Sequence, residues 1–148
     1  MADKKPIYIT GSPRGLRNQA EKFNKAAWAL YREGHLAIAR YLACYTVELA
    51  LKALRAHNNR RRFLKTHVLA ELVEDAGLTQ ELTDKCASSS RFKASWDAVK
   101  GWNPEIRYEI KNHNAEALRI LNAVGRKDGD GDGVWTWLYP KCKSRGRL

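Results

Sequence analysis

The segment from Gly34 to Leu72 constrains the fold of this chain more strongly than any other. Between Leu36 and Leu54, apolar side chains recur close to the spacing of about 3.6 residues that is typical of an α-helix. Four polar residues lie three, four or eight positions apart and share one narrow stripe of that helix: Arg40, Glu48, Lys52 and Arg55. A helix with so little polar surface is enclosed on most sides. We therefore expect Glu48 to be paired, because an isolated buried carboxylate is costly.

The helical pattern extends over most of the chain. Expected helices cover residues 16–32, 35–56, 66–77, 79–87, 91–100 and 103–125. The last of them has the clearest start, because Asn103 is a favourable N-cap and Pro104 suits a first turn. Thr66 is the expected cap of the third helix, and residues 57–65 are expected to form a loop. The pattern predicts an all-α protein, an up-and-down helical bundle of four to five helices.

The two ends differ in composition from the bundle. Residues 1–15 are rich in Pro and Gly and are expected to form an irregular N-terminal arm, with the short β-prone sequence PIYIT offering at most one strand. Residues 126–148 form a Gly/Asp-rich turn and an aromatic and basic C-terminal tail. Within this tail, residues 134–139 alternate like a strand or dock on the bundle as an apolar strap. The bundle domain itself is expected to span residues 16–125.

Asp128, Asp130 and Asp132 imitate the first half of a calcium-binding loop. The twelfth position of such a loop carries a carboxylate, but here it is Tyr139. A flexible turn is therefore the favoured interpretation, although a weak ion site stays open, and we assign no metal site. None of the sequence motifs for nucleophilic, phosphate-loop or dinucleotide-binding enzymes occurs, so we expect no cofactor.

The formal net charge of +11 over 148 residues indicates an anionic partner. The charge is uneven, and four basic residues fall in one short segment: Arg60, Arg61, Arg62 and Lys65. This segment is a candidate for non-specific RNA or DNA backbone contacts, whereas the alternative is a basic surface that only aids solubility. The three cysteines have no metal-ligand spacing, and no apolar run is long enough for a membrane span. A soluble, cytoplasmic protein is expected.

Three short motifs resemble those of the HEPN domain family. They are ELALKAL from Glu48 to Leu54, THVLAEL from Thr66 to Leu72, and the stretch from Ile106 to His113. The resemblance covers about residues 17–125. It implies an all-α bundle, a homodimer and, in some members, metal-independent RNA cleavage by an Arg-x4-6-His element on the last long helix.

By this resemblance, Arg107 and His113 are the candidate catalytic residues. Histidine can move protons near neutral pH, and arginine can hold a phosphate and offset charge in the transition state. Six positions along a helix amount to about 240° of rotation, so the pair needs a local distortion or a second subunit to cooperate. Tyr108 stands where catalytic members favour a polar residue such as Asn. This departure favours the nucleotide-binding branch.

Four further residues complete the candidate site. Glu48 and Lys52 are either a simple i,i+4 pair or a supporting pair in which Glu48 orients Arg107, and Tyr108 is a supporting residue by its position. His67 follows the expected start of the third helix, where it packs, caps or touches a nucleic-acid ligand.

Three functions stay open at this point. The first is an endoribonuclease of toxin or defence type, which would have an antitoxin as a partner. The second is a non-catalytic module that binds RNA or a nucleotide. The third is an interaction subunit of a nucleotidyltransferase-type partner. The net charge favours the first two.

Overall fold

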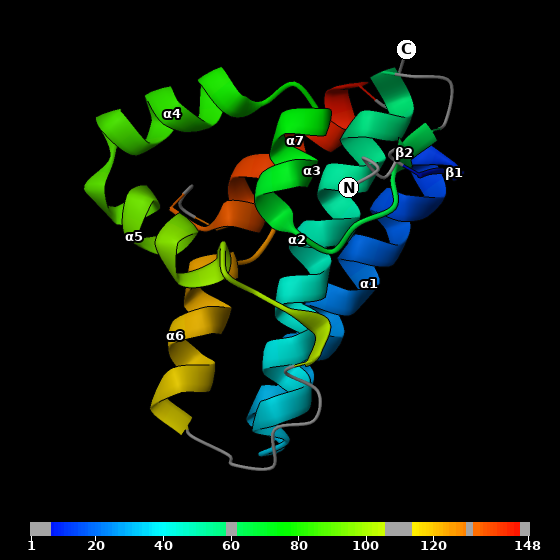
Figure 1. Ribbon diagram of the computed structural model, residues 1–148. Coiled ribbons are helices and arrows are strands. Elements are labelled where there is room, and N and C mark those ends of the chain that lie inside the picture. The colour runs from blue at the N-terminus through cyan, green and yellow to red at the C-terminus, as the bar shows by residue number, and fades with distance from the viewer. Residues whose placement is uncertain (1–6, 59–61, 106–113, 130–131, 146–148) are drawn as a thin grey trace, which may run out of the picture.

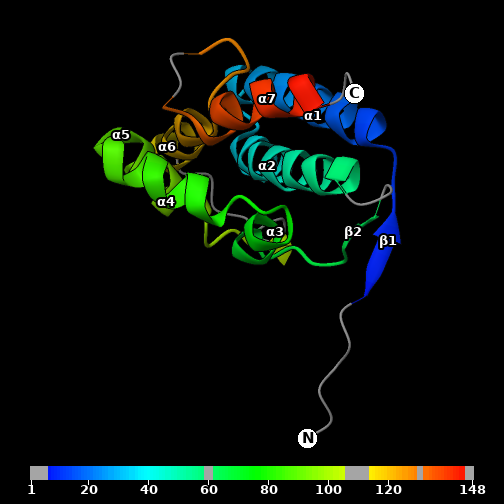
Figure 2. The ribbon, with the colours of Figure 1, turned by 90° about the horizontal axis from the view of Figure 1, so that it is seen from above.

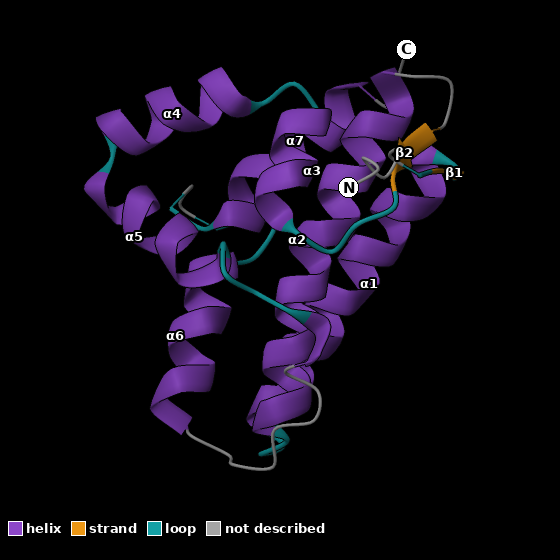
Figure 3. Cartoon of the chain, viewed as in Figure 1, coloured by secondary structure: helices purple, strands orange, loops and turns teal. Residues whose placement is uncertain are grey.

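A computed structural model describes residues 7–58, 62–105, 114–129 and 132–145. Within these ranges the chain forms seven helices and one two-stranded sheet, so the predicted all-α bundle is confirmed (Figure 1; Figure 3). Six of these helices correspond to the six segments that were expected to be helical, and the seventh is formed by the C-terminal tail. No helix in the described ranges is long and apolar enough to cross a lipid bilayer.

Two long antiparallel helices, α1 (Pro13–Arg32) and α2 (Leu36–Asn58), form a hairpin that organises the bundle. The helix α1 begins three residues before the expected start because Ser12 acts as its N-cap, its Oγ accepting from the Gly15 N–H at 3.2 Å. Gly34 has φ +87°, a left-handed conformation that lets the chain reverse directly between the two helices. Local sequence therefore fixes both the start of α1 and the turn of the hairpin.

The remaining helices pack on the hairpin directly or through one another. The short helices α3 (Leu69–Asp75), α4 (Thr79–Ser88) and α5 (Ser90–Val99) follow α2 in sequence, and α6 (Asn114–Val124) packs against both α2 and α5. Seen from above, α2 lies between α1 on one side and α3 on the other (Figure 2). The side chains of Val47, Ala50, Leu51 and Leu54 are buried in the centre of the bundle. This enclosure agrees with the narrow polar stripe of the sequence.

The C-terminal tail folds as a helix, α7 (Val134–Arg145), and the strand interpretation of residues 134–139 is wrong. Trp135, Leu138 and Cys142 are buried against the bundle, and their spacing of three and four positions places them on one helical face. The apparent alternation arose because Trp137 and Tyr139, which lie outside this stripe, are also aromatic and partly buried. The alternative of an apolar segment docked on the bundle is confirmed, since α7 packs against α2 and α6.

The expected loop at residues 57–65 is also partly wrong. The helix α2 continues to Asn58, and β2 (Arg62–Leu64) pairs antiparallel with β1 (Tyr8–Thr10) of the N-terminal arm. In this register Ile9 faces Phe63, whose ring is buried. The sheet ties the arm to the basic segment, a pairing of distant residues that local sequence preferences do not reveal.

The starts of two helices test the capping expectations. Thr66 does not cap α3, because the helix begins at Leu69 with Val68 as its N-cap; instead the Thr66 Oγ1 accepts from the Val68 N–H at 3.1 Å. At Asn103, the N-cap of the helix expected over residues 103–125, the side-chain Oδ1 accepts from the Glu105 N–H at 3.0 Å. Residues 106–113, which were expected to continue this helix, lie outside the described residues, and α6 begins at Asn114.

Candidate functional site

A buried carboxylate at the middle of α2 organises the candidate site. Glu48 is fully buried, and its Oε2 accepts from the Lys52 Nζ at 2.7 Å. Lys52 follows one helical turn later and is itself almost completely buried. The pairing neutralises a charge that could not remain isolated inside the bundle. The expectation of a paired Glu48 is met.

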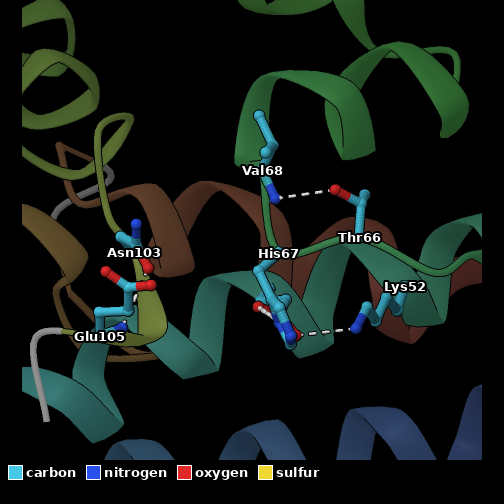
Figure 4. A network of polar contacts seen from close by, with 7 residues as sticks. Lys52, Thr66, His67, Val68, Asn103 and Glu105 are labelled. Atoms are coloured by element: carbon cyan, nitrogen blue, oxygen red, sulfur yellow. Dashed lines mark hydrogen bonds and ion pairs between the residues drawn. The ribbon is translucent and has the colours of Figure 1, made fainter.

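The other oxygen of the same carboxylate holds His67. Glu48 Oε1 lies 2.9 Å from His67 Nδ1, and the histidine side chain is 56% exposed. Because an ionised carboxylate only accepts hydrogen bonds, Nδ1 is the donor, and the neutral ring then has Nε2 as its acceptor. One ring nitrogen is thus bound within the bundle while much of the ring stays accessible. Figure 4 shows His67 reaching down onto α2, with Lys52 to one side of it.

Short local structure places His67 over Glu48. The turn in which Thr66 Oγ1 accepts from the Val68 N–H fixes the chain just before α3. Upstream of His67, the Leu64 N–H donates to Asp75 Oδ2 at 3.1 Å. The Oδ1 of the same carboxylate lies 3.0 Å from Arg55 Nε, so one side chain of α3 binds both β2 and α2. The histidine therefore sits on a segment anchored at both of its ends.

A cavity of about 650 Å³ lies beside this network. One wall is formed by Thr66, His67 and Val68, and the other by the segment from Lys100 to Glu105. Asn103 and Glu105 of the second wall lie on the opposite side of His67 from Lys52 in Figure 4. The cavity is thus bounded by residues that lie far apart in the sequence.

The wall from Lys100 to Glu105 is held on α2 by aromatic packing. The Trp102 ring lies 5.8 Å from the Tyr45 ring, edge to face, and 6.0 Å from the Tyr41 ring. Burial, together with the nearby Glu48 and Tyr41, raises the pKa of Tyr45, so its phenol stays neutral at physiological pH. The Trp102 indole Nε1 is buried and has no hydrogen-bond acceptor among the described residues. A donor is therefore left over in the cavity wall.

The structure brings together only some of the site residues predicted from sequence. Glu48, Lys52 and His67 form one network, in which the Glu48–Lys52 pair was one of the two predicted alternatives and the contact between Glu48 and His67 was not predicted. Arg107, Tyr108 and His113 lie outside the described residues, and so do Arg60 and Arg61. Their predicted roles stay predictions.

The described part of the basic segment is on the surface. Arg62 and Lys65 have exposed side chains, and the Arg62 guanidinium lies 5.4 Å from the centre of the Tyr8 ring. Arg55 approaches the same ring at 5.8 Å. Tyr8 of the N-terminal arm thus lies close to two cations, which couples the arm to the basic segment.

Trp102 and Lys100 were missed by the sequence reasoning. For Trp102 the sequence held a weak signal: a tryptophan directly before Asn103 and Pro104 must either pack on the bundle or line its surface. Only the fold shows that Trp102 does both.

In the predicted calcium-like turn, Asp130 lies outside the described residues, and Asp132 lies 3.9 Å from Arg91. The described residues contain no group of three side chains that could hold a metal ion.

Comparison with known proteins identifies the family. No curated protein and no solved structure matches the chain significantly. The family model of the HEPN domain matches residues 14–126, which is most of the chain. The chain therefore belongs to the HEPN domain family, and this membership supports a nucleotide- or RNA-related role.

Proposed function

We propose that this HEPN protein binds RNA in the cavity beside His67 and cleaves it without a metal ion, as an endoribonuclease of toxin or defence type. One observation carries the proposal: His67, held by the buried Glu48, lines the same cavity as the segment from Lys100 to Glu105. Arg107 and His113 follow Glu105 by two and eight residues. In the sequence, the candidate catalytic pair therefore follows directly after the residues of the cavity wall.

The residue types suit phosphodiester cleavage. His113 takes the proton from the ribose 2′-hydroxyl and the 2′-oxygen attacks phosphorus. The bond from phosphorus to the 5′-oxygen breaks, and the leaving 5′-oxygen takes a proton from water. Arg107 offsets the charge that develops on the phosphoryl oxygens. His67 contacts the RNA strand, and Glu48 keeps its ring in one orientation. Arg62 and Lys65, both exposed, extend the contact along the backbone.

The active species is a homodimer in this proposal. Arg107 and His113 do not share one face of a regular helix, so a residue from each of two copies can complete one site. Apolar side chains beside the cavity and on α6 support such an interface, since Val68 is 47% exposed and Leu118 is 37% exposed. An antitoxin that binds this face would block the site.

A non-catalytic module is the second candidate, and Tyr108 favours it. A tyrosine directly after Arg107 can stack on a base, which suits binding of RNA or a nucleotide without cleavage. A third candidate, an interaction subunit for a nucleotidyltransferase-type partner, has less support, because such a role does not use the net charge of +11.

The test is cleavage of total RNA by the purified protein in EDTA. Arg107→Ala and His113→Ala should each abolish cleavage, and His67→Ala should weaken RNA binding about tenfold, the effect of losing one hydrogen bond. His35→Ala is the matched control, because His35 is an exposed histidine of the α1–α2 turn that lies outside the cavity.

Two results would contradict the catalytic proposal. One is intact RNA with the wild-type protein, and the other is equal cleavage by the Arg107 and His113 variants. If RNA is retained in a strongly salt-dependent manner but stays intact, the binding module replaces the enzyme.

A further inference from the structure

The two-stranded sheet has one open edge, which belongs to β1. The Ile7 carbonyl accepts from the Lys65 N–H at 2.7 Å, so the register places residues 7 and 9 in hydrogen-bonded pairs with residues 65 and 63. The N–H and C=O groups of the alternate residues, Tyr8 and Thr10, therefore point away from β2. In the described part of the chain, neither of these two N–H groups has an acceptor. The edge can thus pair with another strand.

The outer edge of β2 is covered, whereas that of β1 is not. On β2 the Leu64 N–H points outward, and it donates to Asp75 Oδ2 at 3.1 Å. Figure 2 shows β1 at the margin of the molecule, with β2 between it and α3. Ile7, Tyr8 and Ile9 are 61%, 37% and 38% exposed. Soluble proteins normally shield such an edge, so its exposure with apolar side chains indicates a surface that binds a strand.

The two faces of β1 differ in character. Successive side chains of a strand point to opposite faces, so Ile7 and Ile9 lie together on one of them. Tyr8 lies on the other face, where the Arg62 guanidinium is 5.4 Å from the centre of its ring. One face of the open edge is therefore apolar, and the other carries a cation.

The sequence around both strands carries positive charge only. No Asp or Glu occurs in residues 7–20 or 49–70. Arg62 and Lys65 are exposed, and within the described residues neither belongs to an ion pair. A second copy of this chain would bring the same cations to the edge, which disfavours it as the occupant. RNA neutralises the cations but leaves the exposed Ile7 and Ile9 unused.

We propose that β1 binds an extended acidic segment of a partner protein as a third, antiparallel strand. The backbone of this segment bonds to the outward groups of Tyr8 and Thr10. Every second residue of the segment is apolar and packs beside Ile7 and Ile9, and the residues between are acidic and reach Arg62. The inference does not rest on RNA cleavage, because no residue of β1 lines the cavity beside His67.

Fluorescence anisotropy tests the proposal on the full-length protein. The probe is a labelled synthetic peptide of alternating Glu and Val, about eight residues long. It should bind, and a peptide with the same Glu and Val residues in two separate blocks should bind about tenfold more weakly. Residues that pair directly across two antiparallel strands share one face, so the Glu N–H groups point toward β1. N-methylation of the Glu residues should therefore abolish binding, whereas N-methylation of the Val residues should be tolerated.

Two variants of the protein test the same edge. Thr10→Pro removes one outward N–H but keeps the bonds to β2, and it should weaken peptide binding about tenfold. Arg62→Gln should have a similar effect through the loss of one charged hydrogen bond. Arg91→Gln is the matched control, because Arg91 is 84% exposed on α5, which lies across the bundle from β1 in Figures 1 and 2. Melting temperatures show whether Thr10→Pro keeps the fold, and the N-methylated peptides test backbone pairing without any change to the protein.

Four outcomes would overturn the inference. Equal binding of the alternating and block peptides, or of the two N-methylated peptides, would reduce the contact to unspecific charge attraction. Equal peptide affinity in Thr10→Pro and Arg91→Gln would remove the edge of β1 as the site. An RNA oligonucleotide that binds more weakly to Thr10→Pro, with no peptide bound by the wild type, would make the edge an RNA surface. A dimer that Thr10→Pro dissociates would make the occupant a second copy of this chain.

Discussion

Glu48 and His67 are nineteen positions apart in sequence, yet the Oε1 of one lies 2.9 Å from the Nδ1 of the other. The contact joins the centre of α2 to the turn before α3. It fixes the tautomer of a half-exposed histidine by means of a carboxylate that water does not reach. The same carboxylate accepts from Lys52, so one buried residue both stabilises the bundle and orients the cavity wall.

Removing the charge of Glu48 should destabilise the protein. In Glu48→Gln the Lys52 ammonium remains buried without its partner, and the expected loss is about 3 kcal/mol of unfolding free energy. The double variant Glu48→Leu/Lys52→Met removes both charges and should lose less than the single variant. Urea denaturation monitored by circular dichroism measures both. A single variant as stable as wild type would show that the pair is not desolvated in solution.

Arg107 and His113 should complement each other between subunits. If each site combines one residue from either copy, mixing inactive Arg107→Ala and inactive His113→Ala proteins should restore part of the ribonuclease activity. The control is each variant incubated alone at the same total concentration. Subunit exchange is confirmed by size-exclusion chromatography with two copies of different size. If exchange occurs but activity does not recover, both residues act within one copy.

The three cysteines should differ sharply in reactivity. Burial raises the pKa of the Cys44 thiol to about 12, so at pH 8 only about one molecule in ten thousand carries its thiolate. Cys142 is buried as well, whereas Cys86 is partly exposed with its pKa raised chiefly by desolvation. A disulfide reagent at pH 8 should therefore titrate one thiol slowly in the native protein and three after unfolding. Cys86→Ser should abolish the native reaction.

Docking of α7 should contribute strongly to stability. Trp135 is fully buried and its ring lies 5.3 Å from that of Tyr139, so Trp135→Ala should cost about 3–5 kcal/mol. Trp137→Ala on the same helix is the matched control, since Trp137 is only partly buried and should cost less. Equal losses in thermal denaturation would indicate that α7 docks through a different face.

The bundle could be predicted from sequence because residues close together in the chain determine where its long helices form and turn. Apolar spacing along α2 and Gly34 at the hairpin turn each specify their own element. The errors arose where tertiary contacts decide. Residues 134–139 alternate only over six positions, whereas burial of Trp135, Leu138 and Cys142 requires a helix against α2.

The candidate site was less predictable for the same reason. Glu48 and Lys52 are helical neighbours, so their pairing follows from a spacing of four. His67 reaches Glu48 only because Asp75 anchors β2 and α2 together. The wall containing Trp102 depends on aromatic packing with Tyr41 and Tyr45. No pattern of neighbouring residues in the sequence indicates these contacts.

RNA binding should depend on salt through the exposed cations of the basic segment. If Arg62 and Lys65 each neutralise one phosphate, Arg62→Gln and Lys65→Gln should each reduce the slope of log affinity against log salt by about 1. Lys93→Gln is the control, because Lys93 pairs with Asp97 on α5 at 2.7 Å and its loss should leave the slope unchanged. Filter binding from about 50 to 200 mM salt gives the slopes. Equal slopes in all three variants would show that the net charge acts only at long range, and Arg62 and Lys65 would then be ordinary surface residues.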